Sequence, residues 1–101
     1  MTVELAEAFD VRKIEGIVTD ANGKSLEGVM IEVIKISKKK AKLVNICKTQ
    51  KTGRYSFEKL RKGKFKLRFS RAGFDQTTAS VNLSPDANVN NTVRVALGLG
   101  H

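Results

Sequence analysis

Short runs in which apolar and polar residues alternate recur along the chain. The clearest is residues 64–69, KFKLRF, where every second residue is apolar and the residues between are cationic. Residues 55–58, YSFE, repeat this period over a shorter length. Successive side chains of a β-strand point to opposite faces of the sheet, so a period of two predicts strands with one buried face. Both runs are therefore expected to turn their aromatic side chains toward a core.

Five further segments have the alternation or the β-branched content of strands. They are residues 11–19, 29–36, 43–49, 76–83 and 92–97. Turn-forming residues separate the strands, notably the sequence DANG at 20–23 and the glycines at 28, 53, 63 and 73. A helix is the rival interpretation of 29–36, but its β-branched content and the glycine just before it favour a strand.

The strand at 43–49 has two partly apolar faces. We expect Val44 and Ile46 on one face and Leu43, Cys47 and Thr49 on the other. Before this strand, residues 37–42, SKKKAK, are expected to form a cationic loop, and residues 84–91 to form another loop around the only proline.

The ends of the chain are weakly patterned. Residues 1–10 could be a turn of helix, a strand extension or a flexible lead-in, and residues 98–101 are expected to be a frayed tail. One domain over residues 11–97 lies between them, as the length of 101 residues allows. About seven short strands with a turn every 8–12 residues predict an all-β, antiparallel β-sandwich.

No segment has the pattern of a membrane span or a signal peptide. A membrane-spanning helix needs ~20 apolar residues in succession, and no run approaches that length. The first residues, MTVELAEAFDVRK, are acidic and lack the basic start of a signal peptide.

Positive charge is concentrated in the middle of the chain. The formal net charge is +9, and residues 33–74 hold fifteen of the nineteen Lys and Arg side chains against one acid, Glu58. A basic loop and a basic strand face within this segment are a candidate site for a polyanion such as an acidic glycan, a phosphate-bearing surface or nucleic acid. The candidate residues are Lys38, Lys39, Lys40, Lys42, Lys64, Lys66 and Arg68. The competing interpretation, which we favour, is a solvated lysine-rich surface that keeps an edge strand from aggregating.

The residues that catalytic and metal sites require are scarce. Cys47 is the only cysteine and His101 the only histidine, so no internal disulfide, no zinc cluster and no Ser/His or Cys/His pair is predicted. We expect no catalytic residues, no metal and no cofactor. Cys47 and Tyr55 lie on predicted strands, where a buried structural role is favoured over a reactive thiol or a ligand-stacking ring.

Two series of residues resemble a known family. The first comprises Ile14, Gly16, Val18, Asp20, Asn22, Gly23, Leu26, Gly28, Val29, Ile31 and Val33. The second comprises Thr49, Gly53, Tyr55, Phe57, Leu60, Gly63, Phe65, Leu67, Ser70, Gly73 and Phe74. In this order and spacing they resemble the carboxypeptidase regulatory-like domain, and the resemblance covers roughly residues 13–97.

The resemblance implies a transthyretin-like (prealbumin-like) Greek-key sandwich of seven strands. It also implies a non-catalytic accessory, structural or adhesive domain of an exported or cell-surface protein, with a protein or cell-envelope partner. Two residues or segments depart from the family: Gln50 stands where an Asp is frequent, and residues 38–42 are unusually basic. The alternatives are a polyanion-binding module and, less favoured, a carbohydrate-binding module, because the chain has no Trp and one Tyr.

Overall fold

The computed structural model describes residues 2–88 and 91–100, and within these ranges the chain forms nine strands. They are β1 (Thr2–Glu4), β2 (Phe9–Val11), β3 (Ile14–Asp20), β4 (Met30–Ser37), β5 (Lys40–Lys48), β6 (Arg54–Phe57), β7 (Gly63–Ser70), β8 (Gln76–Leu83) and β9 (Val93–Leu97). The predicted all-β class is confirmed, with two more strands than expected. His101 of the predicted tail and residues 89–90 of the predicted 84–91 loop lie outside the described residues.

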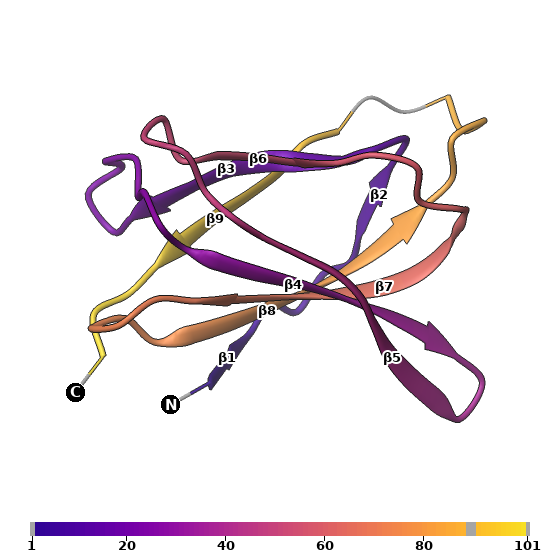
Figure 1. The fold of residues 1–101 in the computed structure, drawn as a ribbon, viewed down its shortest axis with the longest axis horizontal. Helices are drawn as coiled ribbons and strands as arrows, with labels where there is room; N and C mark the ends of the chain where they lie inside the picture. Colours follow the sequence, from indigo (N-terminus) through magenta and orange to yellow (C-terminus); the bar gives the residue numbers. More distant parts are fainter. Residues whose placement is uncertain (1, 89–90, 101) are drawn as a thin grey trace.

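The strands form two sheets that face each other (Figure 1). The large sheet has the order β1-β8-β7-β4-β5, with β2 also pairing with β8, and the small sheet has the order β6-β3-β9. The pairs made by β4, β5 and β7 are antiparallel, as predicted. However, β1 and β2 each pair with β8 in parallel. In the small sheet, β3 pairs with β9 in parallel as well. The sandwich is therefore mixed, because both ends of the chain join it through parallel pairs.

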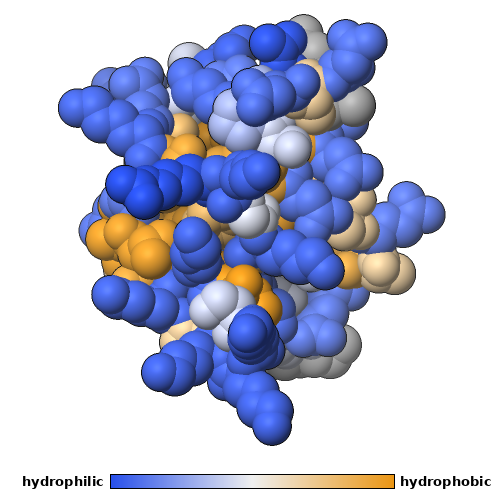
Figure 2. Space-filling view, turned by 90° about the vertical axis from the view of Figure 1, so that its right-hand side faces the viewer, coloured by the Kyte–Doolittle hydropathy of each residue, from blue (hydrophilic) through white to orange (hydrophobic). Residues whose placement is uncertain are grey.

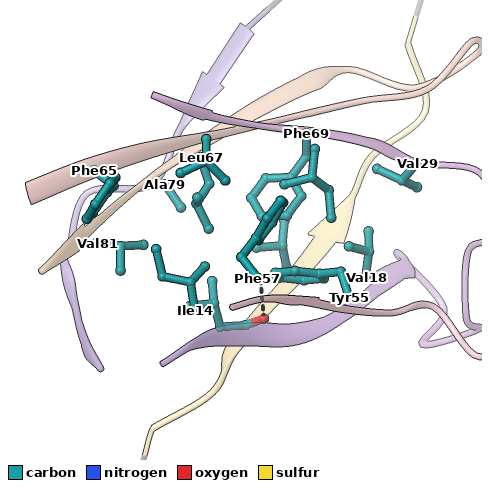
Figure 3. Packing of buried hydrophobic residues seen from close by; sticks show 14 of the residues in the cluster. Ile14, Val18, Val29, Tyr55, Phe57, Phe65, Leu67, Phe69, Ala79 and Val81 are labelled. Carbon is teal, nitrogen blue, oxygen red and sulfur yellow. Dashed lines mark hydrogen bonds between the residues drawn. The ribbon is translucent and has the colours of Figure 1, made fainter. Parts of the chain in front are cut away.

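The core lies between the two sheets and is built as the alternation predicts (Figure 3). Phe65, Leu67 and Phe69 of β7 are buried, and so are Tyr55 and Phe57 of β6. The Tyr55 and Phe69 rings meet edge to face across the core, with centroids 5.7 Å apart. The polar residues between them point outward, which leaves their side chains available to solvent or to a partner.

Three residues of the small sheet are fitted together around Gly16 of β3. The Tyr55 hydroxyl donates a buried hydrogen bond to the Val93 carbonyl oxygen at 2.9 Å, so Tyr55 connects β6 to β9 across β3. A Cβ atom on Gly16 would collide with that carbonyl oxygen and would lie 2.8 Å from the Tyr55 hydroxyl oxygen. Gly16 is therefore required for the close approach of these three strands.

The first predicted strand, 11–19, is in fact divided between the two sheets. Val11 ends β2 in the large sheet, and β3 begins at Ile14 in the small sheet. The exposed residues Arg12 and Lys13 carry the chain across. Residues 1–10 contain β1 and most of β2, so the strand extension is the alternative that holds. Its partner, β8, is more than sixty residues away in sequence, which local patterning cannot reveal.

The predicted cationic loop at 37–42 is shorter in the structure. Ser37 pairs with Lys40, so only Lys38 and Lys39 form the turn, and Lys38 has a positive φ of 43°. Lys40 and Lys42 belong to β5 instead. An edge strand tolerates lysines because their ammonium groups remain in water.

The predicted faces of residues 43–49 also need correction. Opposite β4, Asn45 pairs with Val33 and Leu43 pairs with Ile34, so Val44 is the extra residue of a β-bulge. The bulge shifts the alternation, and Leu43 and Val44 are both exposed.

The tail is not frayed between residues 98 and 100. The Gly98 carbonyl oxygen accepts a hydrogen bond from the Asp75 N–H at 2.8 Å, and the Gly100 N–H donates to the Gly73 carbonyl oxygen at 3.0 Å. A bridge between Phe74 and Leu99 lies between them.

Replacing Gly16 with alanine is expected to lower the free energy of unfolding by about 3 kcal/mol, at the upper end of the range for overpacked cores. The added methyl group must displace either the Val93 carbonyl or the Tyr55 hydroxyl. Denaturation by urea measures the change. Gly98→Ala is the control, because nothing lies within 4 Å of its Cβ position. A loss of less than ~0.5 kcal/mol for Gly16→Ala would contradict the close approach.

Candidate functional site

The seven cations proposed from the sequence lie on two strands and one turn and do not form one surface. Lys38 and Lys39 occupy the β4–β5 turn, Lys40 and Lys42 lie on β5, and the other three, Lys64, Lys66 and Arg68, lie on β7. Strand β4 separates β7 from β5 in the sheet. Lys64 and Lys66 pair with Ile36 and Ile34 of β4, so apolar residues stand between the two groups of cations.

Two of the three β7 cations are bound to carboxylates. Arg68 holds Glu32 through two hydrogen bonds, Nε to Oε1 at 2.9 Å and Nη2 to Oε2 at 3.1 Å. Lys66 Nζ lies 3.8 Å from Glu4 Oε1. The hydrogen bond from Arg68 and its positive charge hold the pKa of Glu32 below the usual 4.5, against an opposing effect of burial. The same bond raises the pKa of Arg68. Arg68 and Lys66 are therefore less available to a polyanion than the sequence alone implies.

The edge strand β5 exposes an unusual amount of apolar surface. Leu43, Val44 and Ile46 are 51%, 40% and 50% exposed. Lys40, Lys42 and Lys48 lie along the same strand, which contains no acid. Figure 2, which views the end of the molecule that carries the β4–β5 turn, shows apolar patches set among hydrophilic side chains. We call β5 with these exposed side chains the β5 edge.

A groove of about 520 Å³ lies where β5 approaches β6. Figure 1 shows the chain after β5 crossing from the large sheet toward the small one. The groove takes residues from β3, β5, β6, β9 and their connections, and its lining includes Arg54, Arg94 and Lys48. Ser56, Thr92 and Gln50 add polar groups, and Glu15 is the acid of the lining.

Two residues of the groove lining, Cys47 and Tyr55, carry a thiol and a phenol, and neither group is activated as a nucleophile. Cys47 is partly exposed, and burial raises the pKa of its thiol, which disfavours the thiolate. Tyr55 is a core residue, as predicted, and burial is the main cause that raises the pKa of its hydroxyl. Within residues 2–88 and 91–100, no group of three or more His, Cys, Asp or Glu side chains is placed to hold a metal ion.

The sequence did not indicate that Arg54 and Arg94 line the same groove. It also did not indicate that apolar side chains of β5 are exposed. Each arginine could be assigned to an outward position, because each alternates with buried residues, Tyr55 or Val93 and Val95. Their proximity depends on the long-range pairing of β3 with both β6 and β9. For β5 a signal was present, since the neighbours Leu43 and Val44 break the alternation.

The fold and the pattern of turns agree with a comparison against protein families. Residues 13–98 match the carboxypeptidase regulatory-like domain. The chain belongs to this family. The resemblance drawn from the glycines and alternating strands is thus confirmed. Domains of the family are non-catalytic.

Among solved structures, the regulatory-like domain is similar to part of the pilus adhesin RrgA from Streptococcus pneumoniae. The TM-score is 0.62 at 15% sequence identity, so the likeness is one of fold. It covers 91% of this chain but 15% of the adhesin chain. A search of curated protein sequences gave no significant match. None of the described residues forms a helix that is long and apolar enough to cross a membrane.

Glu32→Gln is expected to destabilise the domain at pH 7 by roughly 0.5–1 kcal/mol, the range for an opposite-charge pair across strands. Because the pKa of Glu32 is lowered in the folded state, its stabilising effect is present above about 4.5 and disappears as the pH falls through the folded value. The difference between wild type and Glu32→Gln should therefore shrink as the pH is lowered.

Urea denaturation at a series of pH values measures this difference. Glu27→Gln is a matched control, because Glu27 is exposed and forms no ion pair with another described residue. If the two variants had the same stability at every pH, the Glu32–Arg68 pair would contribute nothing.

Proposed function

We propose that this regulatory-like domain is a non-catalytic interaction module of an exported or cell-surface protein, and that it binds a partner protein by pairing a strand with the β5 edge. The observation that carries the proposal is the exposure of Leu43, Val44 and Ile46 on a nine-residue strand at the end of its sheet. Edge strands present unpaired backbone groups, and natural proteins usually keep them short, charged or covered. The β5 edge carries lysines, but it is long and also exposes apolar side chains.

β5 is held in place before any partner arrives. Every residue of β5 except the bulged Val44 pairs with β4. The next residue, Thr49, is held by two hydrogen bonds of its side chain. The Thr49 hydroxyl donates to the Leu26 carbonyl oxygen at 2.6 Å and accepts from the Val29 N–H at 2.9 Å. A preformed strand reduces the conformational entropy that binding would otherwise cost. The Ile46 N–H donates to Asn45 Oδ1 at 2.8 Å, so an incoming strand that uses this donor must displace the amide.

Charge determines which partner suits this edge. In a dimer of two β5 strands, lysines of one copy would face lysines of the other, and like charges opposite each other are destabilising. A partner strand that alternates acidic and apolar residues would place carboxylates near Lys40 and Lys42 on one face and apolar side chains against Leu43 and Ile46 on the other. We therefore infer an acidic, extended segment of another protein as the partner.

The membership of the family supports the non-catalytic part of the proposal. The similarity to part of a pilus adhesin is consistent with a surface location, although at 15% identity it concerns the fold. The polyanion interpretation of the lysines is the second candidate. It is favoured by one observation: five of the seven cations, all but Lys66 and Arg68, form no ion pair with a described residue.

Two nine-residue peptides separate these candidates. One alternates Glu and Val, and the other has the same charge but carries Pro at two of the Val positions, which blocks strand pairing. If β5 adds a strand, the first peptide should bind about tenfold more tightly or better, a difference of ~1.4 kcal/mol. Fluorescence anisotropy gives the affinities, and amide NMR shifts at residues 40–48 locate the site.

Ile46→Thr should weaken binding of the Glu–Val peptide, because it removes apolar contact area while keeping β propensity. Leu99→Thr is the control, since Leu99 is 69% exposed and lies outside β5. Equal binding of both peptides would favour the polyanion candidate. Binding of neither peptide, or an undiminished affinity in Ile46→Thr, would overturn the strand-addition proposal.

A further inference from the structure

The outward face of the small sheet carries a row of three residues with an arginine at each end. Ile17 of β3 pairs with Arg54 of β6 on one side and with Arg94 of β9 on the other. Both arginines are exposed, and the residues next to them in sequence, Tyr55 and Val93, are buried. The two guanidinium groups therefore project from the same face of the sheet, on either side of an apolar residue.

Neither arginine has a carboxylate partner among the described residues. Among the residues that the structure describes, no acid lies within 4.0 Å of either guanidinium group. Glu15, the acid in the groove lining, already lies with its Oε2 atom 3.8 Å from Lys13 Nζ. Two unneutralised guanidinium groups on the strands that flank β3 repel each other unless water, salt or a ligand screens them, so an anion between them would be stabilised.

The groove supplies further donors from other directions. Lys48 enters from β5, and the hydroxyl groups of Ser56 and Thr92 belong to the same lining. Its volume of about 520 Å³ lies within the usual range for ligand pockets, ~300–1,000 Å³. Adjacent strands are about 4.8 Å apart, so β6 and β9 are separated by roughly 10 Å, a gap that two arginine side chains can close over one small anion.

We propose that this groove binds a tetrahedral oxyanion, a phosphate or sulfate group carried by an ester, held between Arg54 and Arg94. Three cations that approach from three different strands suit an ion with oxygens on all sides better than a planar carboxylate. The arginines supply pairs of parallel N–H donors, which match the oxygen spacing of such groups. Lys48 contributes as a point charge. The site is separate from the seven lysines and arginines proposed from the sequence.

An NMR titration of the full chain at constant ionic strength tests the proposal, with inorganic phosphate, inorganic sulfate and acetate as probes. The Nε–H signals of Arg54 and Arg94 should shift with saturation at about 1–10 mM phosphate or sulfate, equivalent to roughly 3–4 kcal/mol of binding. Acetate should bind at least about tenfold more weakly. Phosphate binding should strengthen as the pH rises through the second pKa of inorganic phosphate, near neutrality, because the dianion then forms, whereas sulfate binding should not change. The ratio of the two affinities indicates whether the groove prefers a phosphate or a sulfate group.

Variants locate the site. Arg54→Gln or Arg94→Gln should weaken phosphate binding about tenfold or more, and Arg54→Lys should also weaken it, because the charge remains but the paired donors are lost. Arg61→Gln removes the same charge from an exposed position outside the groove and should change affinity less than about twofold. All three positions are exposed, so thermal unfolding should be nearly unchanged.

Three results would overturn the site. They are an equal loss of affinity in Arg61→Gln, acetate binding as tight as sulfate binding, and the absence of saturable shifts at both arginines. The outcome is independent of the β5 edge, because Ile46→Thr should leave phosphate binding unchanged. Failure of peptide binding and failure of anion binding can therefore be told apart.

Discussion

The contact between Gly16, Tyr55 and Val93 is the constraint on which the small sheet depends. The Tyr55 ring packs in the core against Phe69 of the opposite sheet. Its hydroxyl group donates a hydrogen bond to a backbone carbonyl oxygen of β9. That bond is possible because β3 carries no side chain at Gly16. A buried tyrosine hydroxyl without a partner would cost about 1–3 kcal/mol, so the same group that packs the sandwich also fixes the position of β9. Because β9 is held in this position, Arg94 pairs with Ile17 of β3.

The charges of the molecule are distributed by the same alternation that builds the core. Apolar residues at every second position of β6, β7 and β9 leave their neighbours outside, and many of these neighbours are cationic. Whether such a cation is free depends on the strand next to it. Arg68 lies opposite Glu32 and is neutralised, whereas Arg54 and Arg94 lie on either side of Ile17 and form no ion pair with a residue that the structure describes. Arginines that alternate with buried residues in the same way can therefore differ in whether they have an acidic partner.

The chain has a fold that also occurs as part of a longer protein. It matches a family whose domains are non-catalytic, and its fold corresponds to 15% of the pilus adhesin chain. We propose that the function of this domain resides in surfaces that the sandwich leaves uncovered. Here these are an edge strand of the large sheet with exposed apolar side chains, and a groove, mostly on the small sheet, whose two arginines have no carboxylate partner among the described residues.

The sequence by itself determined most of the strands, the turns between them and the inner faces of β6 and β7. This was possible because alternation and turn residues are local properties: the aromatic residues of β6 and β7 and the turn at 20–23 could be assigned without any partner strand. The family could be recognised for the same reason. Only the tertiary structure decided which strands are neighbours. The division of residues 11–19 between two sheets, the bulge at Val44 and the positions of Arg54 and Arg94 on either side of Ile17 all arise from pairing between segments that are separate in sequence. Such pairing is set by how two whole sheets pack, and no single stretch of the chain records it.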